Sequence, residues 1–182
     1  GEEEARQLQE YRAAFEQSRD AILFQDQERF RHCNPATLAM FRVPDLATFA
    51  TLHPGDLSPP TQPDGRPSAE AAAARIDEAF DQGQAFFEWR SRTWDGVEFP
   101  SEVLLSRIER EEGAILQALV RDISRRKEAI EALRKREQEL AEVQRIAGLG
   151  SWVADFRTNE IRWSDEVYSI FGMNREEWGG WL

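Results

Sequence analysis

The spacing of hydrophobic positions near the N-terminus has the period of a helix. Apolar side chains recur there at intervals of three and four residues: Ala5, Leu8, Tyr11 and Phe15. This spacing places them on one face of an amphipathic helix, predicted over residues 3–17. The period then shortens, because apolar residues 21–24 and a returning segment, 29–33, flank the polar residues 25–28. This pattern predicts a β-hairpin.

Short helices and a loop are expected after this hairpin. Asn34 and Pro35 are typical of a helix start, because Asn caps free N–H groups and Pro fits the first helical position. A helix should follow over residues 36–41, and a second short one over 45–51. Residues 54–67 contain five of the eight prolines and two glycines, so they are predicted to form a loop.

A longer helix and three strands complete the first predicted domain. Ser68 should cap a helix over residues 69–82, which should end at Gly83. Three strand-like segments follow, separated by turn residues: 85–93, 98–109 and 114–121. The order of two strands, several helices and three strands predicts an α+β domain. We expect a five-stranded antiparallel sheet with helices packed on one face, over residues 20–122 and preceded by an N-terminal helix within 1–19.

A long helix is predicted over residues 123–147. Its hydrophobic residues repeat at intervals of seven and three: Ile123, Ile130, Leu133, Leu140 and Ala147. This heptad spacing favours a seam between two copies of the chain, with polar Glu137 and Gln144 interrupting it. The alternative is a helix that packs back on its own domain. Either Asp122 or Ser124 can cap its first turn.

Residues 148–182 repeat the order of the first hairpin and helix. Gly148 and Gly150 end the long helix, and residues 151–156 and 160–163 predict two strands before a helix over 165–171. Placing Asn34 over Ser164 aligns three apolar pairs: Leu38 with Tyr168, Met40 with Ile170, and Phe41 with Phe171. The repeat predicts the truncated start of a second domain, and therefore a fragment of a longer tandem-domain protein.

Several stretches, taken in order, resemble the PAS (Per-Arnt-Sim) family of sensory domains. They are YRAAFEQS (11–18) with DAI (20–22), HCNPA (32–36) with Phe41, FEWR (87–90) with DGVEFP (95–100), and RDISRRK (121–127). The resemblance covers residues 10–127. GLGSW (148–152), IRWSD (161–165) and FG (171–172) resemble the start of a second PAS domain.

The resemblance implies a function in signal transduction. PAS domains bind a small molecule between the sheet and the helices, or dimerise, and pass the change along a helix. The output domain, a histidine kinase or diguanylate cyclase of a bacterial two-component protein, would lie outside this chain. We therefore expect a sensor rather than an enzyme, with a ligand-independent dimerisation module as the alternative.

Alternation along the predicted strands indicates which residues face a cavity. The candidate pocket residues come from two helices and two strands: Met40, Phe41, Ile76, Phe80, Phe87, Trp89, Ser101 and Val103. Trp89 would form an aromatic wall, and the Ser101 hydroxyl would orient a ligand. Ordinary core packing is the alternative interpretation. Asp122, with Ser124, is the candidate for coupling the sheet to the long helix.

Charge and rare residues narrow the classes of partner. The net charge is −11, from 34 acidic and 23 basic residues, which argues against nucleic-acid binding. We expect a homodimer through Leu8, Tyr11, Phe15 and the helix 123–147. With one cysteine, Cys33, and no visible signal peptide or membrane-spanning run, we expect a cytoplasmic fragment that makes no membrane contact.

The same rare residues argue against the known cofactors of the family. His32 and Cys33 are adjacent in a strand and face opposite sides, so they cannot readily bind one metal. Helix 69–82 lacks the histidine that haem-binding PAS domains require, and the flavin motif G-x-N-C-R-F-L-Q is absent. Cys33 lies away from the position of a thiol-linked chromophore. We therefore expect no haem, flavin or coumarate, and the ligand stays unknown.

Overall fold

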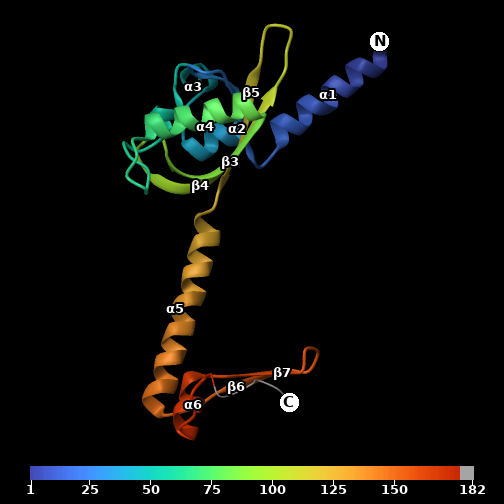
Figure 1. Cartoon of the computed structure of the whole chain (residues 1–182). Helices are drawn as coiled ribbons and strands as arrows, with labels where there is room; N and C mark the ends of the chain where they lie inside the picture. Colours follow the sequence, from blue (N-terminus) through green and yellow to red (C-terminus); the bar gives the residue numbers. More distant parts are fainter. Residues whose placement is uncertain (177–182) are drawn as a thin grey trace. The chain divides into compact units, whose positions relative to one another are not determined.

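The computed structural model describes residues 1–176, which fall into two compact units divided between Arg125 and Arg126 (Figure 1). The predicted C-terminal region extends to residue 182, so its last six residues lie outside the described range. The elements of the first unit are α1 (Glu2–Gln17), β1 (Ala21–Gln25), β2 (Phe30–Cys33), α2 (Pro35–Phe41), α3 (Leu46–Phe49), the 3-10 helix η1 (Pro54–Leu57), α4 (Ser68–Gln82), β3 (Gln84–Arg92), β4 (Glu98–Ile108) and β5 (Ile115–Asp122).

The first unit is built on one antiparallel sheet of five strands. The strand order is β2-β1-β5-β4-β3, so the first hairpin pairs with the last strand of the meander. In the register of this junction, Leu23 on β1 lies opposite Ala118 on β5. The helices α2, α3 and α4 cover the sheet (Figure 1). The predicted α+β architecture is therefore confirmed.

The core lies between the sheet and the helices. Inward positions alternate along the strands, as in β1, where Ala21, Leu23 and Gln25 are buried while the residues between them are half-buried. Phe30 of β2 stacks on Phe49 of α3, with ring centroids 4.7 Å apart. Burying each such side chain stabilises the fold by about 1.5–3 kcal/mol. This packing holds the short helices against the sheet.

The capping predictions have different outcomes. Asn34 caps α2, because its side chain accepts a hydrogen bond from the Thr37 N–H. Gly83 ends α4 with a positive φ of 91°, as expected. The prediction that Ser68 caps α4 is wrong. Ser68 is the first helical residue, and its hydroxyl accepts a hydrogen bond from the Gln62 side chain instead.

The N-terminal helix α1 presents two large apolar side chains to solvent. Leu8 is 69% exposed and Tyr11 is 71% exposed. Phe15 differs from them, because its ring lies 5.4 Å from the His32 ring and 5.8 Å from the Phe24 ring. Phe15 therefore packs on its own sheet while remaining partly exposed, and its contact with a second chain stays a prediction.

The second unit contains most of the long helix and a small hairpin. Its elements are α5 (Ser124–Ala147, of which the first two residues belong to the first unit), β6 (Trp152–Asp155), β7 (Glu160–Trp163) and α6 (Asp165–Phe171). The predicted order of hairpin and helix is confirmed, whereas the domain limits drawn from the sequence stay predictions. No helix among residues 1–176 is both long and apolar enough to cross a membrane.

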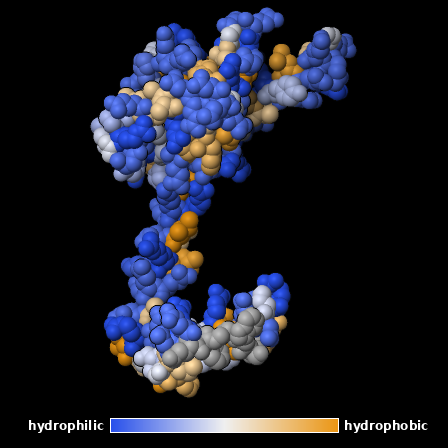
Figure 2. Space-filling view, viewed as in Figure 1, coloured by the Kyte–Doolittle hydropathy of each residue, from blue (hydrophilic) through white to orange (hydrophobic). Residues whose placement is uncertain are grey.

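Ile123 does not belong to the helical seam predicted for residues 123–147. It precedes α5, is 3% exposed, and donates its N–H to the Pro100 carbonyl. It anchors the chain to the first unit because its side chain is buried and its N–H is bonded to β4. The seam positions within α5, Ile130, Leu133 and Leu140, are each 59% exposed, and Figure 2 shows apolar side chains at the surface of this helix.

Candidate ligand cavity and helix junction

A small cavity lies in the first unit between the sheet and the helices. Its volume is about 70 Å³. The lining residues are predominantly apolar: Leu23, Gln25, Phe30, Phe41, Pro54, Leu57, Ser58, Ala72, Ile76, Phe87, Trp89, Ser91, Val103, Leu105, Ala118 and Val120. None of these side chains is ionisable. The wall therefore suits a neutral, largely apolar occupant.

The structure brings together most of the predicted pocket residues. Those that line the cavity are Phe41, Ile76, Phe87, Trp89 and Val103. Met40 and Phe80 do not line it, although both pack against the core and are partly exposed. Ser101 is also absent from the lining, although it is fully buried.

Ser101 lies behind the cavity wall and is hydrogen-bonded to two residues that line it. Its hydroxyl donates to the Trp89 carbonyl at 3.1 Å and lies 2.8 Å from the Ser91 hydroxyl. Because the Ser101 proton goes to that carbonyl, Ser91 is the donor to Ser101. The prediction that Ser101 contacts a ligand directly is therefore corrected, and its hydroxyl instead ties β3 to β4.

A second polar contact fixes the aromatic wall. The Trp89 indole N–H donates to the Ser58 hydroxyl at 2.9 Å, and that hydroxyl donates to the Pro54 carbonyl at 2.7 Å. Phe87 packs edge-on against Trp89, with ring centroids 5.8 Å apart. The start of the proline-rich loop is thus joined to β3, a contact that the sequence pattern did not indicate.

Gln25 is a lining residue that the sequence analysis missed. It reads as the first residue of a polar turn, but β1 extends through it. It then occupies the inward position after Ala21 and Leu23, and it is only 4% exposed. The alternation of β1, continued by one residue, was the signal that could have identified it.

The junction between the sheet and α5 contains the predicted coupling residues. Asp122 ends β5, and its carboxylate accepts hydrogen bonds from the Ser124 N–H at 2.8 Å and hydroxyl at 2.6 Å. This satisfies one of the free donors in the first turn of α5. Asp122 also lies opposite Ser101 in the β4–β5 register, so the junction adjoins the wall of the cavity.

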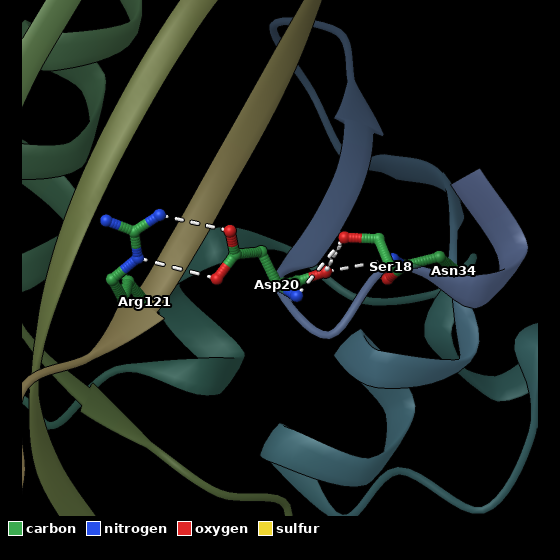
Figure 3. A network of polar contacts seen from close by, with 4 residues as sticks. All are labelled: Ser18, Asp20, Asn34 and Arg121. Carbon is green, nitrogen blue, oxygen red and sulfur yellow. Dashed lines mark hydrogen bonds and ion pairs between the residues drawn. The ribbon is translucent and has the colours of Figure 1, made fainter. Parts of the chain in front are cut away.

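A neighbouring ion pair joins the start of β1 to the end of β5 (Figure 3). The Arg121 guanidinium donates to both Asp20 oxygens, at 3.0 and 3.4 Å. Hydrogen bonds to Asp20 raise the pKa of Arg121 above its ordinary value. On the other side of Asp20, its carbonyl accepts from Asn34, which also donates to the Phe15 carbonyl of α1. The exit of α1 and the approach to α5 therefore share one polar network.

The cysteine and histidines do not form a reactive site. Cys33 is 4% exposed, and burial, with a smaller effect from the Glu16 charge, raises the pKa of its thiol to about 12. His32, on the opposite face of β2, is exposed and stacks on Phe15. Within residues 1–176, no cluster of three His, Cys, Asp or Glu side chains could hold a metal ion.

Comparisons with known proteins identify the fold of the first unit. Residues 9–82 match the family described as PAS domain. A PAS domain from Colwellia psychrerythraea is 21% identical with a TM-score of 0.56, covering 65% of this chain and 98% of that one. A domain of a sensory box sensor histidine kinase/response regulator from Geobacter sulfurreducens is 24% identical with a TM-score of 0.51. The match covers 62% of this chain and 92% of that one.

A third similar structure contains a small molecule. It is the PAS domain, in complex with ethanol, of a transcriptional regulator of the LuxR family from Burkholderia thailandensis. It is 18% identical with a TM-score of 0.50, covering 63% of this chain and 97% of that one. No curated protein matches the chain. At these identities, the structural matches establish the fold alone.

Proposed function

We propose that this chain, whose residues 9–82 belong to the PAS domain family, is a sensory module that binds a small molecule and signals through α5. The observation that carries the proposal is the apolar cavity of about 70 Å³ between the sheet and the helices. The signal would reach an output domain, a histidine kinase or diguanylate cyclase, outside this sequence. The single cysteine, a free thiol, supports a reducing cytoplasmic setting.

The position of the cavity supports a route to the helix. Trp89 and Ser91 of β3 line the cavity, and both are hydrogen-bonded to the Ser101 hydroxyl on β4. Ser101 lies opposite Asp122, which holds the first turn of α5 through Ser124. A ligand that displaces the cavity wall would act on this short chain of contacts. It changes the output only if it binds the two states of the domain with unequal affinity.

Native mass spectrometry of residues 1–182 purified from cells tests the ligand directly. The protein is measured intact and again after denaturation. A mass retained by the folded protein and released on unfolding supports the proposal and gives the class of ligand. An empty protein that also fails to take up small neutral probes in solution would contradict it.

A ligand-independent dimerisation module is the second candidate function. It is favoured by Ile130, Leu133 and Leu140, which lie on α5 and are each 59% exposed. Leu8 and Tyr11 on α1 are exposed to a similar extent. Helices with such unpaired apolar seams are typically stabilised by a partner helix. An empty cavity in a stable homodimer would favour this function over ligand sensing.

A further inference from the structure

The cavity contains one polar side chain whose hydrogen-bonding groups are unused. The Gln25 amide lies on the inner face of β1, is 4% exposed, and borders the cavity. No hydrogen bond joins this side chain to any residue within the described range, 1–176. An amide has two donor hydrogens and an acceptor oxygen, and leaving them unpaired in an apolar interior is destabilising.

The neighbouring polar groups in the wall cannot supply the same chemistry. The Ser58 proton goes to the Pro54 carbonyl, and the Trp89 N–H goes to Ser58. The Ser91 proton goes to Ser101, as the direction of the Ser101 bond requires. Among the lining side chains, Gln25 therefore carries the donor hydrogens that remain available to an occupant.

The backbone around Gln25 is consistent with a specialised position. The β1–β2 ladder shifts register between Phe24 and Gln25, so that Gln25 lies opposite Phe30 rather than Arg31. Such bulges bend a strand and redirect its side chains, and they are common beside binding sites. On its other side, Gln25 pairs with Leu116 of β5, which holds its backbone in the sheet.

We propose that Gln25 is the polar anchor of the ligand, and that the ligand is a small neutral molecule with one amide-like or alcohol-like group on an apolar body. This inference rests on the proposed sensing function and specifies its ligand class. The oxygen of the ligand's polar group accepts a hydrogen bond from the Gln25 side-chain NH₂. The N–H or O–H of the same ligand group donates to the Gln25 side-chain carbonyl. The apolar body contacts the hydrophobic wall, with Trp89 and Phe87 on β3 and Ile76 on α4.

Size and charge limit this class further. An apolar cavity of about 150 Å³ accommodates benzene, so a cavity of about 70 Å³ suits a molecule of only a few heavy atoms. A carboxylate or ammonium group finds no opposite charge among the lining residues, so its desolvation is uncompensated. The ligand is therefore neutral.

Titration of residues 1–182 with three probes, followed by ¹⁵N–¹H NMR, tests the proposal. Propionamide carries the expected group, propionate has nearly the same shape with a charge, and xenon occupies apolar cavities without hydrogen bonds. Probe concentrations reach about 100 mM for the two organic molecules, because so few heavy atoms limit affinity. The Gln25 side-chain amide and the Trp89 indole give separate signals from the cavity.

We expect propionamide to shift the Gln25 side-chain signals and propionate to leave them unchanged. Gln25→Met retains the shape of the side chain but not its amide. It should weaken propionamide binding about tenfold or more and leave xenon binding intact. Gln117→Met makes the same change on β5 at a position that does not line the cavity, and it should leave both probes unaffected.

Other outcomes separate this inference from the function on which it rests. Propionamide that binds equally to the wild type and Gln25→Met would overturn the role of Gln25 while leaving a sensing cavity. The same conclusion would follow if propionate bound the wild type as tightly as propionamide. A bound water on Gln25 that no probe displaces would also overturn it. If neither xenon nor propionamide enters the wild-type protein, the proposed ligand-binding function itself fails.

Discussion

Replacing Asn34 by alanine tests the network that joins α1, β1 and α2. The Asn34 side chain is fully buried and makes five hydrogen bonds. Its oxygen accepts from the N–H groups of Ile22 and Thr37. It also shares the single hydrogen of the Thr37 hydroxyl with the Ile22 carbonyl. Its amide donates to the Phe15 and Asp20 carbonyls, at 3.1 and 2.9 Å. Asn34→Ala removes all five contacts without disturbing the apolar core.

The magnitude follows from the groups left behind. Loss of a helix cap costs about 1 kcal/mol. A buried backbone donor such as the Ile22 N–H, left without its partner, costs about 1–3 kcal/mol. The Phe15 carbonyl adds about 1 kcal/mol, because its contact with Asn34 is only partly buried. The total is roughly 3–5 kcal/mol, a large fraction of the 5–15 kcal/mol by which a domain is typically stable.

Thermal unfolding of residues 1–182, followed by circular dichroism, measures this loss. Asn34→Ala should lower the Tm of the first unit by roughly 10–20 °C. Asn34→Asp keeps the cap, so its Tm should lie between those of the wild type and Asn34→Ala. Ser164→Ala removes one hydrogen bond to the Ser151 N–H in the second unit. It should leave the unfolding transition of the first unit unchanged. A loss below about 1 kcal/mol for Asn34→Ala would refute the assignment of this network as a structural hub.

Three further predictions concern the junction, the thiol and α5. Asp122→Ala should speed amide exchange in the first turn of α5 and make the output of the full-length protein independent of ligand, whereas fully retained regulation would refute its coupling role. Cys33 should resist alkylation at pH 8 until the protein unfolds. Burial raises the pKa of the Cys33 thiol from 9.0 to about 12 in the folded protein. The contribution of the protonated thiol to stability should therefore be complete below pH 9 and decline as the pH rises toward 12. Denaturant titrations at several pH values can measure this decline. If α5 forms a homodimer seam, Leu133→Glu with Leu140→Glu should convert dimer to monomer in sedimentation experiments, and Lys135→Glu, away from the predicted seam, should not.

The parts of the fold that could be predicted are those specified by local sequence. Asn34 before Pro35 identified the start of α2, because a cap acts within three residues of its own position. Gly83 identified the end of α4 because its backbone has a positive φ. The order of strands and helices was likewise sufficient to predict the five-stranded sheet.

The errors arose where a contact distant in sequence decides the role of a residue. Ser68 has the chemistry of a cap, but Gln62 uses its hydroxyl, and a helical pattern carries no sign of that loop contact. Ile123 fits a heptad by spacing, yet it is buried before α5 begins and donates its N–H to Pro100 of β4. Ser101 has the correct inward periodicity, but its bonds to Ser91 and Trp89 place it behind the cavity wall. Gln25 was missed because a polar residue beside acidic neighbours is typical of a turn.

The backbone amide spectrum of residues 1–182, followed during titration with propionamide, tests whether ligand binding reaches α5. We predict shifts at cavity residues such as Trp89 and, at the same ligand concentrations, at Asp122, Ile123 and Ser124 where α5 begins. Shifts confined to the cavity would show that binding does not reach the helix. That result would contradict the proposal that this domain transmits a ligand signal through α5.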